Sequence, residues 1–422
     1  MAEKTIQNDP SCMDDYDPDS ITPVQALENI FNTIKPVKET ESVPVREALG
    51  RVLANNITSE INVPGGRNSA MDGYAIKGSD IPDHEIKKMS LIGTCLAGKP
   101  FRDFVNEGEC VRIMTGAIMP EGTDTVVIQE RAIVVGDFIN IGNDTKPGDN
   151  VREAGEDLAI GDLVLEKGMR LTPADIGLLA SLGFVNVSVF KNIKVAFFST
   201  GDELRSVGEE LEDGAIYDSN RYTLYGMLAR LGVEIIDMGV VGDDKELLER
   251  AFQEAAEEAD VLVTSGGVSV GDADYIKETL EKFGDVNFWK VAMKPGRPLT
   301  FGKIDKTYFF GLPGNPVSVM ITFYQFVLPG LKKLMGEKYT PPILLKVPCV
   351  SKLKKRPGRV EYQRGVLEKD ETGRTIVRKT GKQGSGILRS MADANCFIVL
   401  PLDSEGVTPD EMVDVQLFHG IV

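Results

Sequence analysis

Hydrophobic residues near the start of the chain recur at helical spacing. In the stretch TPVQALENIFNTI, five apolar residues form one stripe along a predicted helix: Val24, Ala26, Leu27, Ile30 and Phe31. Thr22 followed by Pro23 is typical of a helix start, because proline fits the first turn without losing a hydrogen bond. The next stretch, VPVREALGRVLANNI, continues the helical pattern, which therefore extends over residues 21–61.

The helical pattern stops at about residue 62. Short runs of β-forming residues follow as far as residue 150, including ECVRIM, DTVVIQE and RAIVVGDFINI, with Gly, Pro and Asp turns between them. A second helical stretch, LTPADIGLLASLG, comes later. Thr172 suits its N-cap, Pro173 its first position and Gly183 its end.

Apolar strands and amphipathic helices alternate over residues 191–336. The strand-like runs IKVAFFST, EIIDMGVV, DVLVTSGG and KTYFFGL are separated by helical stretches, of which KELLERAFQEAAEEA has a charged outer face. This alternation predicts a parallel sheet covered on both faces, with ligands bound beyond the carboxyl ends of its strands. The final stretch, 337–422, lacks helical periodicity and reads as a small β domain.

Composition and charge narrow the classes of protein. The chain has 422 residues, enough for about two to four domains. It carries 47 Lys and Arg against 64 Asp and Glu, a net charge of −17, which disfavours binding to nucleic acid or to anionic membranes. The polar, acidic residues 1–20 lack the apolar core of a signal peptide, and we expect them to be a disordered lead.

The cysteine and histidine content disfavours disulfides and zinc. The five cysteines are scattered and include no C-x-x-C pair, as expected for reduced thiols in a cytoplasmic protein. His84 and His419 are the only histidines, too few for a zinc site of ordinary ligand spacing. No run approaches 18 apolar residues, so we expect no transmembrane helix.

Glycine-rich polar loops follow three of the predicted strands: STGDEL, TSGGVSVGDADY and GLPGNPVSV. Such loops can turn backbone N–H groups onto an anion, although a single one is usually only a turn. Three of them on one edge of a parallel sheet predict a substrate-binding site. The residues predicted to line it are Ser199, Thr200, Gly201, Ser265, Gly266, Gly267, Ser269, Asp272, Pro313, Gly314, Asn315 and Pro316.

A basic segment, KPGRPLTFGK, lies between the second and third of these loops. It carries Lys294, Arg297 and Lys303, and its prolines stiffen the chain around Pro295 and Gly296. A solvated basic turn is one interpretation. Rigidly held cations in an otherwise acidic chain favour the other, a site for a phosphate or oxyanion.

Several acids accompany the predicted anion site. Asp202 and Glu203 lie in the first loop, Asp272 and Asp274 in the second, and REAGEDL adds Arg152, Glu156 and Asp157. Carboxylates repel an anion unless a cation lies between them, and Mg²⁺ suits that position. Each acid taken alone could instead cap a helix.

Taken together, these motifs resemble a known family. NSAMDGYA, MTGA, STGDEL, SGGVSVGDADY, KPGRP and GLPGNPVS occur in the order and at the spacing found in molybdopterin molybdenumtransferases and in the E domain of gephyrin. The resemblance covers the chain from about residue 21 to its end. It implies a multidomain α/β fold: an elongated helical domain (21–61 with 151–190), an inserted β domain (62–150), a three-layer α/β/α pterin-binding domain (191–336) and a C-terminal β-barrel (337–422).

The resemblance also implies an activity. Family members insert molybdenum from molybdate into adenylylated molybdopterin and release AMP in the presence of Mg²⁺, as homodimers with a shared cleft. The adenylyltransferase of the pathway is a further partner that the resemblance suggests. Carried over by motif, the residues implied as catalytic are Asp72, Thr115, Asp157, Glu203 and Asp274, of which Asp157, Glu203 and Asp274 are the implied metal ligands. The residues implied as binding substrate further include Arg152, Lys294, Arg297, Arg364 and Ser385. Arg297 stands where some relatives carry lysine.

The first of these motifs, NSAMDGYA, raises a specific hypothesis. Asp72 lies in the stiff loop NSAMDGYAI, and we expect it to reach with Thr115 into the α/β cleft of a partner subunit. Three alternatives remain open: an adenylyltransferase built on the same α/β domain, a non-catalytic scaffold like gephyrin, and a nicotinamide-nucleotide deamidase.

Overall fold

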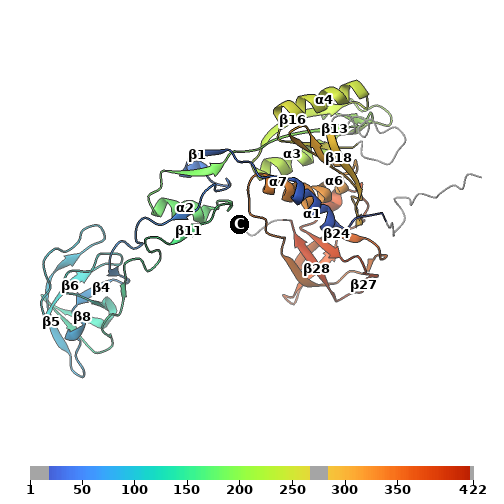
Figure 1. Ribbon diagram of the computed structural model, residues 1–422. Helices are drawn as coiled ribbons and strands as arrows, with labels where there is room; N and C mark the ends of the chain where they lie inside the picture. The colour runs from blue at the N-terminus through green and yellow to red at the C-terminus, as the bar shows by residue number, and fades with distance from the viewer. Residues whose placement is uncertain (1–18, 267–283, 419–422) are drawn as a thin grey trace, which may run out of the picture. The chain divides into compact units, whose positions relative to one another are not determined.

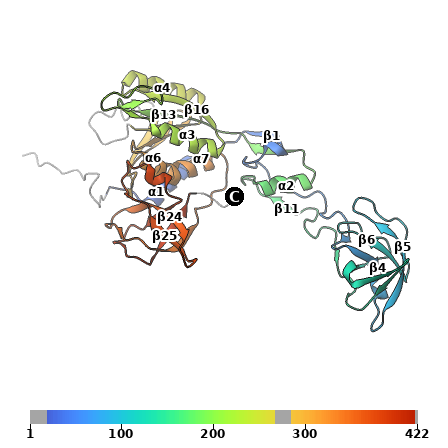
Figure 2. The same ribbon diagram turned by 180° about the vertical axis from the view of Figure 1, so that it is seen from behind.

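The computed structural model describes residues 19–266 and 284–418 (Figures 1 and 2). The chain divides into two compact units. The first holds the described residues up to 54, residues 168–172 and those from 187 onwards; the second holds residues 55–167 and 173–186. Within the described residues, no helix is long and apolar enough to cross a membrane.

The first predicted helix is confirmed as α1 (Pro23–Thr33). Its N-cap is Thr22, and a capping box joins Thr22 to Gln25 through reciprocal hydrogen bonds. Ala26 and Ile30 are fully buried in the core of the first unit, whereas Val24 is 66% exposed and does not belong to the predicted stripe.

The predicted continuation of this helical region over residues 45–61 is wrong. After strand β1 (Thr40–Pro44), this segment holds a single 3₁₀ turn η1 (Val45–Glu47) and bridges from Val52 to Arg170 and from Leu53 to Val189. Gly50 adopts a left-handed φ of 74°, which a helix interior does not contain. The helix-like spacing of the buried residues arises because the segment packs on other extended segments of the same unit, not from a helical backbone.

The core of the first unit is a six-stranded sheet in the order β16-β13-β17-β21-β20-β18. The bounds of the first four strands are Glu234–Val241, Lys194–Thr200, Val261–Ser265 and Thr307–Leu312, and these four are parallel. Val195 and Phe197 of β13 face one core cluster, while Ala196 and Phe198 face another. Helix α3 (Ser219–Leu231) covers the first face and α4 (Lys245–Glu258) the second, giving three layers (Figure 1).

The sheet is not wholly parallel, which corrects the prediction. β20 (Pro298–Ile304) runs antiparallel to β21, and β18 (Gly284–Lys290) runs antiparallel to β20. Much of the basic segment, PLTFGK, is therefore strand and not a solvated turn. Lys303 lies on this strand, with its Nζ 4.9 Å from the centre of the Tyr308 ring, so it belongs to the sheet.

The chain after the PGNP loop is helical with one interruption. It consists of α6 (Pro316–Thr322), a π turn η4 (Phe323–Val327) and α7 (Leu328–Leu334). Pro329, in the first turn of α7, has no N–H to continue the regular ladder, which accounts for the wider turn before it. A Cβ on Gly330 would lie 2.9 Å from Phe310 and 3.2 Å from Ile34, so this glycine allows the segment after α1 to approach α7 closely.

The C-terminal region forms a closed barrel of five strands. The strands pair in the order β24-β25-β22-β28-β26, and β26 pairs again with β24. Their bounds are Val360–Lys369, Thr375–Lys379, Leu344–Cys349, Glu411–Leu417 and Cys396–Leu400. The short strand β19 (Met293–Lys294) pairs with β24 and so joins the barrel to the basic segment of the α/β domain. Smaller elements complete this unit: β12 (Asn186–Phe190), β14 (Leu204–Arg205), β15 (Ile216–Tyr217), β23 (Leu353–Lys354), β27 (Gly406–Val407) and α8 (Arg389–Ala392).

The second unit contains the predicted β-rich region. Its six-stranded sheet has the order β7-β4-β6-β5-β9-β8, with bounds Thr125–Ile128, Gly73–Ile76, Glu109–Ile113, Lys87–Cys95, Phe138–Ile141 and Ala132–Val135. The unit also holds 3₁₀ turns η2 (Gly78–Asp80) and η3 (Gln129–Arg131), helix α2 (Pro173–Ser181), and the short strands β2 (Ile57–Thr58), β3 (Asn68–Ser69), β10 (Val151–Arg152) and β11 (Leu163–Leu165). The domain boundaries drawn from the sequence stay a prediction.

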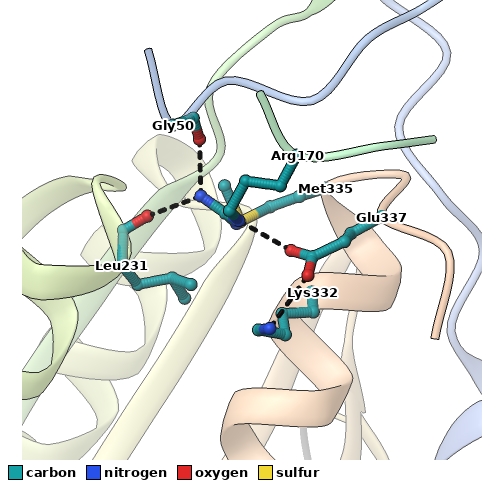
Figure 3. A network of polar contacts seen from close by, with 6 residues as sticks. All are labelled: Gly50, Arg170, Leu231, Lys332, Met335 and Glu337. Atoms are coloured by element: carbon teal, nitrogen blue, oxygen red, sulfur yellow. Dashed lines mark hydrogen bonds and ion pairs between the residues drawn. The ribbon is translucent and has the colours of Figure 1, made fainter. Parts of the chain in front are cut away.

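A polar network fixes the segment 168–172 within the first unit (Figure 3). The Arg170 guanidinium forms an ion pair of 2.8 Å with Glu337, and its Nη1 donates to the carbonyls of Gly50 and Leu231. Lys332 pairs with the other oxygen of Glu337 at 2.8 Å. The half-buried Arg170 is thus neutralised by a carboxylate of its own unit.

Candidate functional site

A cavity of about 1990 Å³ opens in the first unit, between the α/β sheet and the barrel. Its walls come from loops after β13, β17 and β21, from the start of α3, from the basic segment, and from barrel residues. A cavity of this size at the carboxyl ends of parallel strands is the expected place for a ligand in this kind of sheet.

The three predicted glycine-rich loops meet at this cavity. Thr200 and Gly201 end β13, Ser265 and Gly266 end β17, and four residues after β21 complete the wall: Pro313, Gly314, Asn315 and Pro316. They converge because neighbouring parallel strands end at the same edge of the sheet. Ser199 is fully buried behind the wall. Gly267, Ser269 and Asp272 lie outside the described residues.

Gly266 has a steric role. Its φ is 96°, and a Cβ there would lie 2.4 Å from the carbonyl oxygen of Thr200. No other residue fits without moving the β13 loop. However, its N–H donates to the Leu312 carbonyl at 3.1 Å, so it is not free to cradle an anion as the sequence suggested.

The basic segment lies on the cavity wall with Lys294, Pro295, Gly296 and Arg297. Lys294 forms an ion pair of 3.0 Å with Glu361 of β24, whose side chain is 10% exposed. Gly296 has a φ of 90°, and a Cβ there would lie 2.6 Å from the Thr322 hydroxyl, so the tight turn depends on glycine. An anion at this wall would share Lys294 with Glu361.

Arg364 of β24 is the most deeply buried cation of the cavity wall, at 1% exposure. Its guanidinium donates to the Ser390 hydroxyl and to the carbonyls of Tyr362 and Gly384, at 3.1, 3.4 and 3.2 Å. All three acceptors are neutral, and within the described part of the chain Arg364 forms no ion pair. Burial lowers the pKa of Arg364 to about 10, while the more distant charge of Glu361 raises it, so the group stays cationic at neutral pH.

Ser385 joins the barrel to the PGNP loop. Its carbonyl accepts a hydrogen bond of 3.0 Å from the Val317 N–H in the first turn of α6, and the residue lines the cavity. In the same loop, the Gln383 Oε1 accepts from the Arg364 N–H at 2.8 Å. The loop that carries Ser385 and the strand that carries Arg364 are therefore held together.

The predicted acids are only partly brought together. Glu203 lines the cavity, and so does Asp243, which accepts a hydrogen bond from the Thr200 hydroxyl. Asp157 belongs to the second unit and Asp274 lies outside the described residues. No cluster of three or more candidate metal ligands occurs within 19–266 and 284–418, and the metal set stays a prediction.

Asp72 and Thr115 meet in the second unit. The Asp72 Oδ1 accepts hydrogen bonds from both the N–H and the hydroxyl of Thr115, each at 2.7 Å. These two bonds, the backbone one first, lower the pKa of the exposed Asp72 carboxyl. Gly73 beside it begins β4, where a Cβ would lie 2.1 Å from the Val127 carbonyl oxygen, so only glycine lets the chain enter the sheet there. Arg152, whose side chain is exposed, lies in strand β10 opposite Asn68 of strand β3 in the same unit.

Sequence reasoning missed several residues of the cavity wall. One group is a basic run in the barrel, SKLKKRPGR, which supplies Lys352, Lys354, Lys355, Arg356 and Arg359. Its density of cations in an acidic chain was a usable signal. A second group, Asp218, Asn220 and Asp243, carries no such signal, because acids and amides beside helices are common as caps.

Family models match three regions of the chain. The MoeA N-terminal region (domain I and II) matches residues 21–183, a probable molybdopterin binding domain matches residues 196–333, and the MoeA C-terminal region (domain IV) matches residues 346–418.

Individual proteins agree with these matches. A molybdopterin molybdenumtransferase from Haemophilus influenzae is 44% identical over 401 residues, covering 94% of this chain and 98% of the relative. A gephyrin from Dictyostelium discoideum is 36% identical over 95% of this chain and 63% of its own length. The crystal structure of a molybdopterin biosynthesis moeA protein from Pyrococcus horikoshii superposes with a TM-score of 0.83 at 31% identity, covering 94% of this chain and all of the other. The chain therefore belongs to the MoeA family, the molybdopterin molybdenumtransferases.

Proposed function

We propose that this protein inserts molybdenum from molybdate into adenylylated molybdopterin and releases AMP. Membership of the MoeA family supports the reaction. The structural observation that carries the proposal is Arg364, a buried guanidinium on the cavity wall whose hydrogen-bond partners among the described residues are all neutral. An unneutralised buried charge is costly, and a bound anion would offset that cost.

Electrostatics explains why the reaction needs this wall. Molybdate and the phosphates of the substrate are anions, and two like unit charges 4 Å apart repel by about 4 kcal/mol at a surface-like dielectric. Lys294, Arg297 and Arg364 offset this repulsion and hold the oxyanion, with Ser385 as a neighbouring hydroxyl. The basic run of the barrel, with Lys352 and Lys354, extends the positive wall toward the phosphates.

Magnesium is part of the proposal. Glu203 and Asp243 supply carboxylate oxygens on the cavity wall, the ligand type that Mg²⁺ prefers, and the residues present therefore fit the ion. When bound, Mg²⁺ would neutralise phosphate charge and polarise the phosphorus toward water. We further propose that Asp157 and Asp274 take part.

A second copy of the chain completes the proposed site. Asp72 presents an exposed carboxylate that Thr115 holds in place through two hydrogen bonds. A carboxylate fixed in this way can cross to a partner molecule without collapsing onto its own domain. The working protein in this proposal is a homodimer in the cytoplasm, a setting that suits the four free cysteines of the described chain, all buried.

The test is a reconstituted assay with purified protein. Adenylylated molybdopterin, molybdate and Mg²⁺ are supplied, and AMP release and molybdenum incorporation are measured together. We expect AMP release to require molybdate and to stop in excess EDTA. Pyrophosphate release from ATP and molybdopterin would instead identify an adenylyltransferase, ammonia release a deamidase, and no turnover at all a scaffold.

A further inference from the structure

Two hydrogen-bond acceptors at the start of α3 are buried on the cavity wall. Asp218 is the N-cap of α3 and is 2% exposed; Asn220, in its first turn, is 8% exposed. Both residues line the cavity. Neither belongs to the residues that the sequence motifs indicated.

The bonding of Asp218 leaves one oxygen unused. Its Oδ1 accepts the cap hydrogen bond from the Arg221 N–H at 3.1 Å. Its Oδ2 is buried and has no partner within the described residues. Helix capping therefore explains the position of Oδ1 but does not explain why Oδ2 is buried.

Asn220 is oriented by its own hydrogen bonds. Its Nδ2 donates to the Gly314 carbonyl at 2.7 Å and lies 3.0 Å from the Ser265 hydroxyl. Because a carbonyl only accepts, the amide nitrogen must face Gly314, and this fixes the amide oxygen on the other side. That oxygen, Oδ1, is also buried and lacks a partner within the described residues.

Two orphan acceptors, two positions apart on one helix start, select a ligand that donates hydrogens. A buried acceptor without a partner costs about 1–3 kcal/mol, so the pair favours a ligand that supplies two N–H groups. Phosphate and molybdate oxygens are excluded, because they bring lone pairs and negative charge to the Asp218 carboxylate. The acceptors thus differ in kind from the cationic groups of the same cavity, Lys294, Arg297 and Arg364.

We infer that Asp218 and Asn220 recognise the 2-amino-4-oxo pyrimidine edge of the pterin. This inference rests on the proposed function for the identity of the substrate. The edge places a ring N–H beside an exocyclic amine, which gives two adjacent donors for two acceptors. Adenine fits less well, since its amine is flanked by ring nitrogens that accept, and one of them would face an orphan oxygen.

The test measures binding of three probes to the full chain: pterin, N2,N2-dimethylpterin, which lacks the amine hydrogens, and AMP. The first variant is Asp218→Asn, which keeps an N-cap oxygen and the side-chain shape but replaces the free acceptor with a donor. Asp218→Ser is the second, and it keeps a cap without the second oxygen. The matched control is Asp244→Asn, which alters the exposed N-cap of α4 outside the cavity.

We expect wild type and Asp244→Asn to bind pterin at least about tenfold more tightly than dimethylpterin, as a charged hydrogen bond predicts. Both Asp218 variants should lose this preference and keep or improve their affinity for AMP. Weaker AMP binding with unchanged pterin binding would overturn the inference in favour of an adenine site. Loss of Mg²⁺ binding alone in the Asp218 variants would overturn it in favour of a cation site. Absence of pterin binding by the wild type would also overturn the inference.

Failure of this inference and failure of the proposed function are distinguishable. If the wild type releases AMP in a molybdate-dependent way while the Asp218 variants keep the pterin preference, only the pterin assignment falls. If the wild type binds pterin selectively but does not release AMP with molybdate, the proposed reaction is refuted and the assignment of the pterin site is retained.

Discussion

Two arginines of the first unit, one half-buried and one fully buried, show how differently one side chain is used. Arg170 pairs with Glu337 and donates to two carbonyls, so its charge is neutralised within the protein (Figure 3). Arg364 is buried more deeply, yet its described partners are neutral oxygens and it lines the cavity. A charge balanced internally stabilises the fold, whereas a charge left unbalanced beside a cavity attracts a ligand.

The largest expected effect is loss of activity from Arg364→Met. Removing one partner of a buried charge pair with the bound anion costs about 2–5 kcal/mol, so molybdate-dependent AMP release should fall by at least about 30-fold. The melting temperature should stay or rise, because an unneutralised buried charge is removed. If Arg364→Met had a much lower melting temperature and undiminished turnover, Arg364 would stabilise the fold, as Arg170 does, and would not bind the ligand. Arg364→Lys, which keeps a charge, should retain part of the activity.

Asp72→Asn extends the comparison between residues of the site and residues of the fold, because it removes a charge assigned to the site without removing a contact of the fold. The Thr115 hydrogen bonds can still be accepted by the amide oxygen, so folding and the proposed dimerisation should be unaffected. Metal insertion should be abolished, as measured by molybdenum incorporation. Size-exclusion chromatography and circular dichroism provide the control. Turnover at the wild-type rate would show that this carboxylate has no part in the site.

Arg170→Met should act on stability instead. It leaves Glu337, 12% exposed, with the ion pair to Lys332 among the described residues, and should lower the free energy of unfolding by about 1–3 kcal/mol. Denaturant titration measures this loss. The folded fraction should keep its affinity for molybdate and its turnover number. Equal loss of turnover in Arg170→Met and Arg364→Met would remove the distinction between the two arginines.

The smallest effect concerns pH. The pKa of Arg364 is lowered to about 10 by burial, so the group binds an anion in its charged form below that pH and loses the charge as pH rises through it. Molybdate affinity should therefore change little between pH 7 and about 9 and decline above about 10. Titration calorimetry at pH 7 and above about pH 10 measures the molybdate affinity, and circular dichroism at the same pH values verifies that the protein is folded. The same decline in Arg364→Met would assign it to another group.

The sequence indicated part of the site because strand ends can be read from local patterns. The loops at Thr200, Ser265 and Gly314 each follow an apolar run, and parallel pairing brings such ends to one edge. Arg364 and Ser385 came from the family motif, since nothing local marks them. The segment 45–61 was read as helical because its buried residues imitate helical spacing, and the antiparallel strand β20 was hidden in a basic, proline-rich stretch.

The amino-acid sequence by itself determined the alternation of strands and helices, the glycines that the tight turns require, and the family of the protein. Only the tertiary structure decided which polar atoms are left without partners. Asp218 looks like any helix cap in the sequence, and its free oxygen becomes visible only when burial and every nearby donor are known. The reason is physical: propensity and periodicity are local, whereas burial and hydrogen-bond satisfaction depend on segments that lie far apart along the chain.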